Sequence, residues 1–170
     1  MIRGRGPQSR GVGHLSANER PLRAHELIEV FSRRPRSSTY NPQYTAGKPY
    51  VVRRGGRSNV YGKQRESSTV NQGTRHPLSV LEFDSVSTRH RPVHSTAKPL
   101  RLLCWLVRSY TDAGDLVCDP FLGSGTTAIA CAIEGRRFVG CELEERYCEL
   151  AAKRVDAALA ERPTASRRAA

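Results

Sequence analysis

Residues 117–127, VCDPFLGSGTT, combine residue types that bind a nucleoside. Gly123 and Gly125 follow directly after a predicted strand, where glycines let the backbone approach a ligand closely. A helix expected to begin at Thr126 points its free amide groups and the positive end of its dipole at the same place. Glu142 ends the next predicted strand, where an acidic side chain can accept hydrogen bonds from two ribose hydroxyls. The pattern indicates a nucleoside site at the carboxyl edge of a sheet; the alternative is a glycine turn that serves only tight packing.

Three other functional motifs partly match the sequence of this loop. Residues 123–128 satisfy the G-x-G-x-x-A pattern of dinucleotide-binding folds, but no second mononucleotide-binding half follows them. A nicotinamide oxidoreductase is therefore kept only as a third hypothesis. A nucleophile elbow at Ser124 fails because Leu122 and Thr126 stand where that motif needs glycines. A phosphate-binding P-loop fails because no lysine follows the glycines.

Alternating helices and strands are expected to position the site. Up to Tyr110, apolar side chains recur every three or four residues, which is typical of an amphipathic helix with Thr96 as N-cap and Pro99 in its first turn. We further predict strands at 116–118 and 137–141, a helix at 126–134 that Gly135 ends, and a helix at 144–161. This order contains a βαβ unit, whose right-handed crossover predicts a parallel sheet.

The preceding residues are less regular. Residues 25–31, HELIEVF, are apolar and bounded by Arg and Pro, which favours a short buried strand, although their spacing also fits one face of a helix. Residues 32–77 hold prolines, a glycine pair, and tyrosines among arginines. We expect there a long, mostly irregular, basic insertion, closed by a short strand at 79–83. Its alternative is a solvated linker.

The charge distribution suggests a partner. The net charge is +12, and residues 1–110 hold 20 basic and 6 acidic side chains (+14) against 8 and 10 (−2) in residues 111–170. A segregated positive charge carried mostly by Arg is typical of phosphate binding and favours nucleic acid over an anionic membrane or an acidic protein. No run approaches the ~20 apolar residues that span a bilayer, and residues 1–13 lack the apolar stretch of a secretory signal. We therefore expect a cytoplasmic protein without membrane contact.

The cysteines indicate no metal site. Their separations of 14, 13, 10 and 7 residues match no zinc or redox spacing. All lie in or beside apolar stretches, so we expect them to be buried, reduced side chains in the core. They are Cys104, Cys118, Cys131, Cys141 and Cys148.

Three segments carry a resemblance to a known family. DPFLGSGTTAIA, the following FVGCELEERYCELAAKRV and the preceding HSTAKPLRLLCWLVRSYT resemble the cofactor half of bacterial and phage DNA amino-methyltransferases, which methylate adenine N6 or cytosine N4 with S-adenosylmethionine. NERPLRAHELIEVF and TYNPQYTAGKPY also resemble a subgroup of these enzymes. The order of a basic insertion before the cofactor motifs agrees with the permuted class of the family, in which the target-base motif comes first.

The resemblance implies roles for individual residues. His94, Lys98 and Pro99 match a family segment beside the cofactor, although Ser95 and Ala97 depart from it. Glu142 is assigned to the ribose hydroxyls. The residues assigned to the loop around the cofactor are Asp119, Phe121, Gly123, Gly125, Thr126 and Thr127. The arginines expected to contact double-stranded DNA are Arg33, Arg34, Arg36, Arg53, Arg54 and Arg57.

One family motif is absent. These enzymes hold the flipped base with an Asp/Asn/Ser-Pro-Pro-aromatic loop, which the 170 residues do not contain. Asn41-Pro42-Gln43-Tyr44 is the nearest match, so Asn41 and Tyr44 are weak catalytic candidates and are assigned instead to the recognition insertion. We expect an N-terminally truncated enzyme, and the alternatives are a non-catalytic DNA-binding remnant or one half of a split methyltransferase with a separately encoded catalytic half.

These observations predict an α/β protein with a partial, Rossmann-like S-adenosylmethionine-dependent methyltransferase fold and a basic irregular insertion. The predicted parts are a remnant of the catalytic half at 1–32, a target-recognition insertion at 33–93, a cofactor-binding βαβ region at 94–161 and a tail at 162–170, which we expect to be frayed. The expected reaction is direct methyl transfer from sulfur to an amino nitrogen of DNA, with S-adenosylmethionine as cofactor and no metal.

Overall fold

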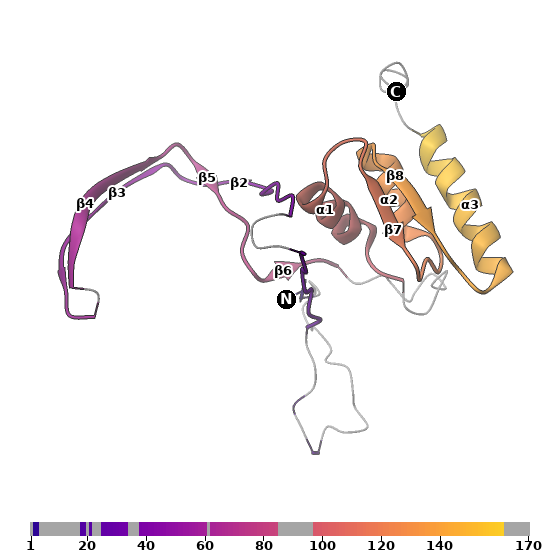
Figure 1. Ribbon diagram of the computed structural model, residues 1–170, viewed down its shortest axis with the longest axis horizontal. Coiled ribbons are helices and arrows are strands. Elements are labelled where there is room, and N and C mark those ends of the chain that lie inside the picture. Colours follow the sequence, from indigo (N-terminus) through magenta and orange to yellow (C-terminus); the bar gives the residue numbers. More distant parts are fainter. Residues whose placement is uncertain are drawn as a thin grey trace. The chain divides into compact units, whose positions relative to one another are not determined.

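The computed structural model describes residues 2–3, 18–19, 21, 25–33, 38–60, 62–84 and 97–161 (Figure 1). The chain divides into two compact units. The first comprises Met1–Asn41 and Ser79–Ala170, and the second is Pro42–Leu78. The second unit is shorter at both ends than the predicted 33–93 insertion.

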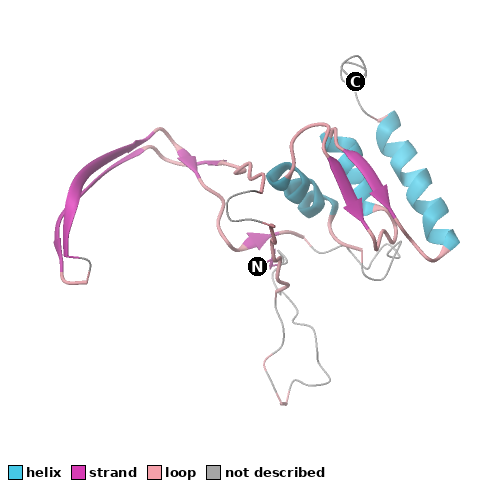
Figure 2. Ribbon diagram, viewed as in Figure 1, coloured by secondary structure: helices cyan, strands magenta, loops and turns pink. Residues whose placement is uncertain are grey.

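The first unit contains the predicted βαβ region (Figure 2). Its strands β7 and β8 pair in parallel, from Leu116 opposite Arg137 to Asp119 opposite Gly140. The parallel pairing predicted from the order of elements is confirmed. The elements of this region are α1 Leu100–Tyr110, β7 Leu116–Asp119, α2 Thr126–Glu134, β8 Arg137–Gly140 and α3 Glu145–Ala160.

The core of this unit lies between α1 and α2. Cys104 and Val107 of α1 pack against Ala130 and Cys131 of α2, and the two α2 residues are fully buried. Small side chains on α2 let the helices approach closely, and burial of each large apolar side chain contributes about 1.5–3 kcal/mol. Gly135 ends α2 in the left-handed conformation at φ 73°, as predicted.

The start of α1 differs from the prediction. Pro99 is the residue before the first helical residue, and its carbonyl accepts hydrogen bonds from the amides of Leu102 and Leu103. Pro99 was expected within the first turn, but its φ of −58° combines with an extended ψ of 130°, so the helix begins one residue later. The predicted N-cap, Thr96, lies outside the described residues.

The expectation that all cysteines are buried is wrong for three of them. Cys104 and Cys131 are buried in the helical core, where the prediction holds. Cys118, Cys141 and Cys148 are exposed, because apolar neighbours in sequence do not place a side chain on the covered face of a strand or helix.

The predicted buried strand at 25–31 is also wrong. Only Glu26 makes a single strand bridge, and Leu27, Val30 and Phe31 are 69%, 52% and 84% exposed. An apolar run forms a buried strand only where a neighbouring strand supplies hydrogen bonds and a covering layer. Among the described residues, pairing along this run is limited to the bridge at Glu26, and Leu27, Val30 and Phe31 stay exposed. Downstream, the predicted strand at 79–83 is reduced to β6 Leu81–Glu82, which pairs in parallel with β1 Ile2–Arg3.

The second unit is a long antiparallel ribbon rather than an irregular segment. Strand β3 Tyr50–Ser58 pairs with β4 Gly62–Asn71, from Tyr50 opposite Asn71 to Ser58 opposite Gly62, with a bulge between Arg54 and Gly56. At its base, β2 Thr45–Ala46 pairs antiparallel with β5 Thr74–Arg75. The expectation of irregular structure fails because the two polar runs, each with β-branched residues, supply hydrogen bonds to each other.

Arg75 stabilises the base of the ribbon through hydrogen bonds and a ring contact. Its guanidinium donates hydrogen bonds to the Asn71 Oδ1 atom at 2.8 Å, to the Thr74 carbonyl at 2.9 Å and to the Lys48 carbonyl, and it lies 4.7 Å from the centre of the Tyr50 ring. This arginine therefore stabilises the ribbon. No helix in the described ranges is long and apolar enough to span a bilayer.

Candidate functional site

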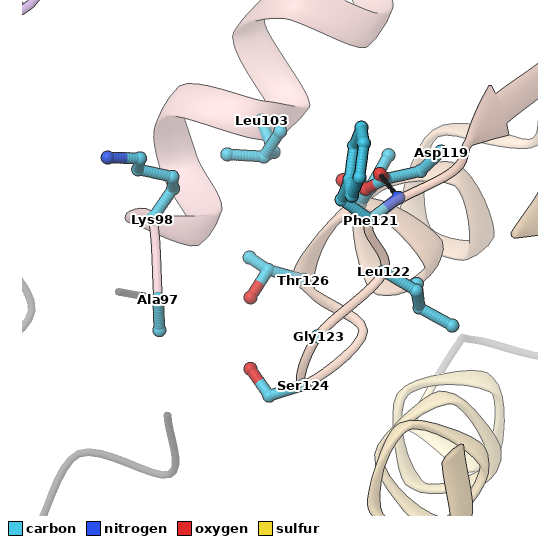
Figure 3. Close-up of a pocket in the computed structure, with 10 residues that line it drawn as sticks. Ala97, Lys98, Leu103, Asp119, Phe121, Leu122, Gly123, Ser124 and Thr126 are labelled. Atoms are coloured by element: carbon cyan, nitrogen blue, oxygen red, sulfur yellow. Dashed lines mark hydrogen bonds between the residues drawn. The ribbon is translucent and has the colours of Figure 1, made fainter. Parts of the chain in front are cut away.

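A pocket opens between the start of α1 and the glycine loop that joins β7 to α2 (Figure 3). The loop follows the carboxyl end of a parallel strand, where the backbone amides at the start of α2 face a ligand. The residues that line the pocket are Ala97, Lys98, Leu103, Asp119, Phe121, Leu122, Gly123, Ser124, Thr126 and Thr127.

Asp119 braces both ends of the loop. One carboxylate oxygen accepts a hydrogen bond from the Phe121 amide at 3.0 Å, and the other accepts one from the Thr127 hydroxyl at 2.6 Å. Because Asp119 is the last residue of β7, these bonds fix the loop to the strand that precedes it. The Phe121 side chain is 88% exposed beside the pocket, where its ring is free to contact a ligand.

Glu142, just beyond the end of β8, braces the middle of the loop. Its Oε2 atom accepts a hydrogen bond from the Gly123 amide at 2.7 Å. Its Oε1 atom accepts bonds from the amides of Leu143 at 2.9 Å and Glu144 at 3.0 Å. The carboxylate predicted to bind ribose therefore also holds the glycine loop, across 19 residues of sequence.

Two glycines give the loop its shape. Gly123 and Gly125 have φ of 53° and 80°, a region that disfavours side chains with a Cβ. The Gly125 amide donates to the Leu122 carbonyl at 3.0 Å, and the Leu122 amide donates to the Cys141 carbonyl at 2.9 Å. These bonds close a tight turn at the edge formed by β7 and β8.

Lys98 contacts the pocket from the α1 side. Its ammonium group forms an ion pair with Glu26 at 2.8 Å, and both side chains are at least half exposed. Pro99 follows at the start of α1, outside the pocket lining. The predicted cofactor residue His94 lies outside the described residues.

Ser124 is a pocket residue that the sequence reasoning did not assign. It is 4% exposed, and Figure 3 shows its hydroxyl and that of Thr126 on the side of the loop that faces Ala97 and Lys98. Its position between two predicted ligand-facing glycines was the signal that could have identified it. Leu103 also lines the pocket, and its side chain supplies an apolar wall.

Asn41 lies at the end of α1 opposite the pocket. Its backbone amide donates to the Ser109 carbonyl at 2.7 Å, and its side-chain amide donates to the Thr111 carbonyl at 3.1 Å and the Asp112 Oδ1 atom at 2.9 Å. These bonds satisfy acceptors at the carboxyl end of α1, which is about 16 Å long. This geometry indicates a structural brace.

Tyr44 lies in the other unit. Its ring makes an edge contact with His76 at 4.7 Å between ring centres, and the side chain is 54% exposed. The boundary between the two compact units therefore falls within the motif, after Asn41, and the assignment of Asn41 and Tyr44 as weak catalytic candidates stays a prediction.

The predicted DNA-contacting arginines are partly described. Arg53 and Arg54 are exposed on β3, and Arg33 is exposed in the first unit. The placements of Arg34 and Arg36 and of the Arg57 side chain lie outside the description. Arg65 on β4 is an exposed cation of the same ribbon that the sequence reasoning did not include. The sequence Lys63-Gln64-Arg65, in which basic residues alternate with a polar one, could have identified Arg65 as a DNA-contacting candidate.

Comparison with known proteins decides the family. A family model described as DNA methylase matches residues 9–153. The chain belongs to this DNA methylase family. The predicted resemblance to DNA amino-methyltransferases and the partial α/β methyltransferase fold are thereby confirmed.

Individual relatives agree with this family assignment. The chain is 30% identical over 134 residues to the type II methyltransferase M.HpaI of Haemophilus parainfluenzae, which is 78% of this chain and 38% of the relative. It is 44% identical over 64 residues to the type II methyltransferase M2.DpnII of Streptococcus pneumoniae, which is 38% of this chain and 24% of the relative. Among solved structures, the M1.HpyAVI-SAM complex overlaps with a TM-score of 0.43 at 25% identity, over 66% of this chain and 63% of that one. The chain spans 20% to 39% of the length of the curated relatives it matches.

Proposed function

We propose that this chain binds S-adenosylmethionine in the pocket between α1 and the glycine loop. The observation that carries the proposal is the loop at the carboxyl ends of two parallel strands, braced by Asp119 from β7 and by Glu142 just beyond β8. This arrangement suits a nucleoside ligand, because close backbone approach, helix amides and an acidic side chain meet at one edge.

Glu142 can bind the ligand as well as the loop. Each carboxylate oxygen has two acceptor positions. Gly123 takes one position on Oε2, and the two amides of residues 143 and 144 share Oε1. We propose that this carboxylate also accepts hydrogen bonds from the ribose hydroxyls of the cofactor. Phe121 and Leu143, 88% and 101% exposed, offer apolar surfaces beside the loop for the adenine ring.

The proposed reaction is methyl transfer to an exocyclic amino nitrogen of adenine or cytosine in DNA. When bound, S-adenosylmethionine would supply an activated methyl group on its sulfonium sulfur, and the glycine loop with Asp119 and Glu142 would hold it. Transfer would leave the thioether S-adenosylhomocysteine and release the amino proton to solvent. Such a transfer depends on holding the two reactants in line and on excluding water, without a covalent enzyme intermediate. The residues described in the pocket supply the cofactor side of this alignment.

The ribbon of the second unit is proposed as the DNA-binding element. Residues 42–78 hold seven basic side chains and one acidic one, a net charge of +6. Arg53 and Arg54 lie opposite Ser68 and Ser67, and none of the described carboxylates pairs with either guanidinium. Successive residues of a strand face opposite sides, so the two arginines project from the two faces of the ribbon.

A ribbon of this kind fits duplex DNA. The major groove is about 12 Å wide and admits a two-stranded antiparallel ribbon. Arginines on both faces can then reach the phosphates on both walls of the groove, while the opposing serines offer short hydroxyl groups to the same backbone. We propose that Arg53, Arg54 and Arg65 supply phosphate contacts of this DNA methylase, together with Arg33, Arg34, Arg36 and Arg57.

Calorimetry with S-adenosylmethionine tests the cofactor assignment. We expect saturable binding of one cofactor per chain that nicotinamide dinucleotide does not displace. Equal binding of the two nucleotides would contradict the proposal. Transfer of labelled methyl to unmethylated DNA is measured separately, because the 170 residues contain no Asp/Asn/Ser-Pro-Pro-aromatic tetrapeptide. We expect this chain alone to bind the cofactor without transferring label, and robust transfer that Tyr44→Ala abolishes would make residues 41–44 a catalytic loop.

The salt dependence of DNA affinity tests the ribbon. The logarithm of affinity should fall linearly with the logarithm of salt, by about 0.9 per phosphate neutralised, so changing Arg53 and Arg54 to Ala should reduce the slope by up to about 2. The matched control changes Arg146 and Lys153 to Ala, which removes the same charge from exposed positions on α3. Equal slopes for the two double variants would refute the assignment.

A further inference from the structure

Helix α3 contacts the glycine loop from the side opposite the pocket. The guanidinium of Arg154 donates a hydrogen bond to the carbonyl of Ser124, 30 residues earlier in the chain. Ser124 is 4% exposed and lines the pocket. The bond therefore joins α3 directly to the peptide at the centre of the loop.

The backbone of the loop also touches α3. A Cβ added at Gly125 would lie 2.6 Å from the Ala151 Cβ and 2.9 Å from the Ala151 Cα. Ala151 is 3% exposed, and it lies on the same helix one turn before Arg154. One helix face thus supplies a small side chain that admits the loop and a long one that binds it.

The charge of Arg154 is directed at this carbonyl. Burial lowers the pKa of the guanidinium, yet an arginine stays protonated in proteins. In the part of the chain that the structure describes, no carboxylate forms an ion pair with it. A partly buried cation without a carboxylate partner makes a charge-assisted hydrogen bond to a carbonyl oxygen, because the positive charge and the carbonyl dipole attract.

We propose that Arg154 is a positioning residue of the pocket: by holding the Ser124 carbonyl on the α3 side, it turns the hydroxyls of Ser124 and Thr126 and the loop amides toward the ligand. The naming of that ligand as S-adenosylmethionine rests on the proposed function. The positioning itself does not, because the contact exists without a ligand. Asp119 and Glu142 fix the ends and the near side of the loop, and Arg154 fixes its far side.

Hydrogen exchange of the loop amides tests the positioning. Arg154→Met keeps an apolar stem against the helix face and removes every donor. We expect the Gly123 and Gly125 amides, which donate to Glu142 and Leu122, to exchange about tenfold faster or more, while amides of α2 stay at wild-type rates. Arg154→Lys retains one compact donor and should lie between the two. Lys153→Met, at a neighbouring exposed position, is the matched control.

Wild-type exchange at both loop amides in Arg154→Met would overturn the proposal, and so would equal acceleration in Lys153→Met. If Arg154→Met does not fold, as shown by lost protection in α2, Arg154→Gln repeats the test with a neutral polar side chain. Calorimetry then adds the ligand: we expect S-adenosylmethionine affinity to fall about tenfold in Arg154→Met, with partial recovery in Arg154→Lys. A wild-type chain that does not bind this cofactor would contradict the proposed function alone, because loop exchange still reports on Arg154.

Discussion

Replacing Asn41 by Asp separates a structural role from a catalytic one. The base-binding loop of the family accepts Asp, Asn or Ser at its first position, so a catalytic Asn41 would tolerate the change. In the structure, the Asn41 side-chain amide instead donates to the Thr111 carbonyl and the Asp112 carboxylate at the end of α1. A carboxylate has the same shape but no N–H group, and it would face another carboxylate and the negative end of the helix dipole.

The expected loss of stability follows from these contacts. The side-chain amide loses its hydrogen bonds to the Thr111 carbonyl at 3.1 Å and to Asp112 at 2.9 Å, each of which contributes about 1 kcal/mol, and a longer, weaker one to the Arg108 carbonyl at 3.4 Å. Repulsion from Asp112 adds about 1 kcal/mol at a separation near 4 Å in a water-like environment. Asn41→Asp should therefore reduce the free energy of unfolding by about 2–4 kcal/mol, and in a chain of this length each kcal/mol lowers the melting temperature by about 2–4 °C.

The loss of stability in Asn41→Asp should depend on pH in a definite direction. The neighbouring carboxylate and carbonyls should raise the folded-state pKa of the introduced carboxyl above its unfolded value. The destabilisation is then fully present at pH 8 and shrinks as the pH falls toward 4, because the protonated group is neutral and donates one hydrogen bond. Urea unfolding at pH 8 and pH 5 measures this, with Asn59→Asp in the exposed turn of the ribbon as control. Wild-type stability of Asn41→Asp at pH 8 would refute the assignment of Asn41 as a brace.

Three further outcomes are expected. Glu142→Ala should weaken S-adenosylmethionine binding by about 1–3 kcal/mol in calorimetry, because charge-assisted hydrogen bonds to the Gly123 amide and to the ligand are lost; unchanged affinity would remove Glu142 from the site. Gly125→Ala should lower the melting temperature and abolish detectable cofactor binding, since its φ of 80° costs about 1–2 kcal/mol and its Cβ would collide with Ala151; a wild-type melting curve would contradict this. Iodoacetamide at pH 8 should label Cys118, Cys141 and Cys148 rapidly and Cys104 and Cys131 slowly, because burial raises the pKa of both core thiols, that of Cys131 to about 11; five equally fast thiols in the folded chain would show that the core is open.

The sequence alone determined the helices and turns whose conformation depends on residues close in the chain. The three/four spacing of apolar residues in α1, the glycine that ends α2 and the order of strands and helices each report on a backbone conformation that neighbouring residues dictate. The candidate loop was also readable, because Gly123 and Gly125 are needed where φ is positive. These are short-range properties, and they gave the family resemblance its motifs.

The tertiary structure decided which distant groups meet. Glu142 accepts a hydrogen bond from Gly123, Arg154 donates one to Ser124, and Asn41 donates one at the end of α1. No periodicity in the sequence predicts these pairs. The same limit explains the errors at 25–31 and 50–71. A strand depends on a partner elsewhere in the chain to satisfy its hydrogen bonds. In the described residues, the apolar run 25–31 forms only one bridge and stays largely exposed, while two polar runs form a ribbon with each other.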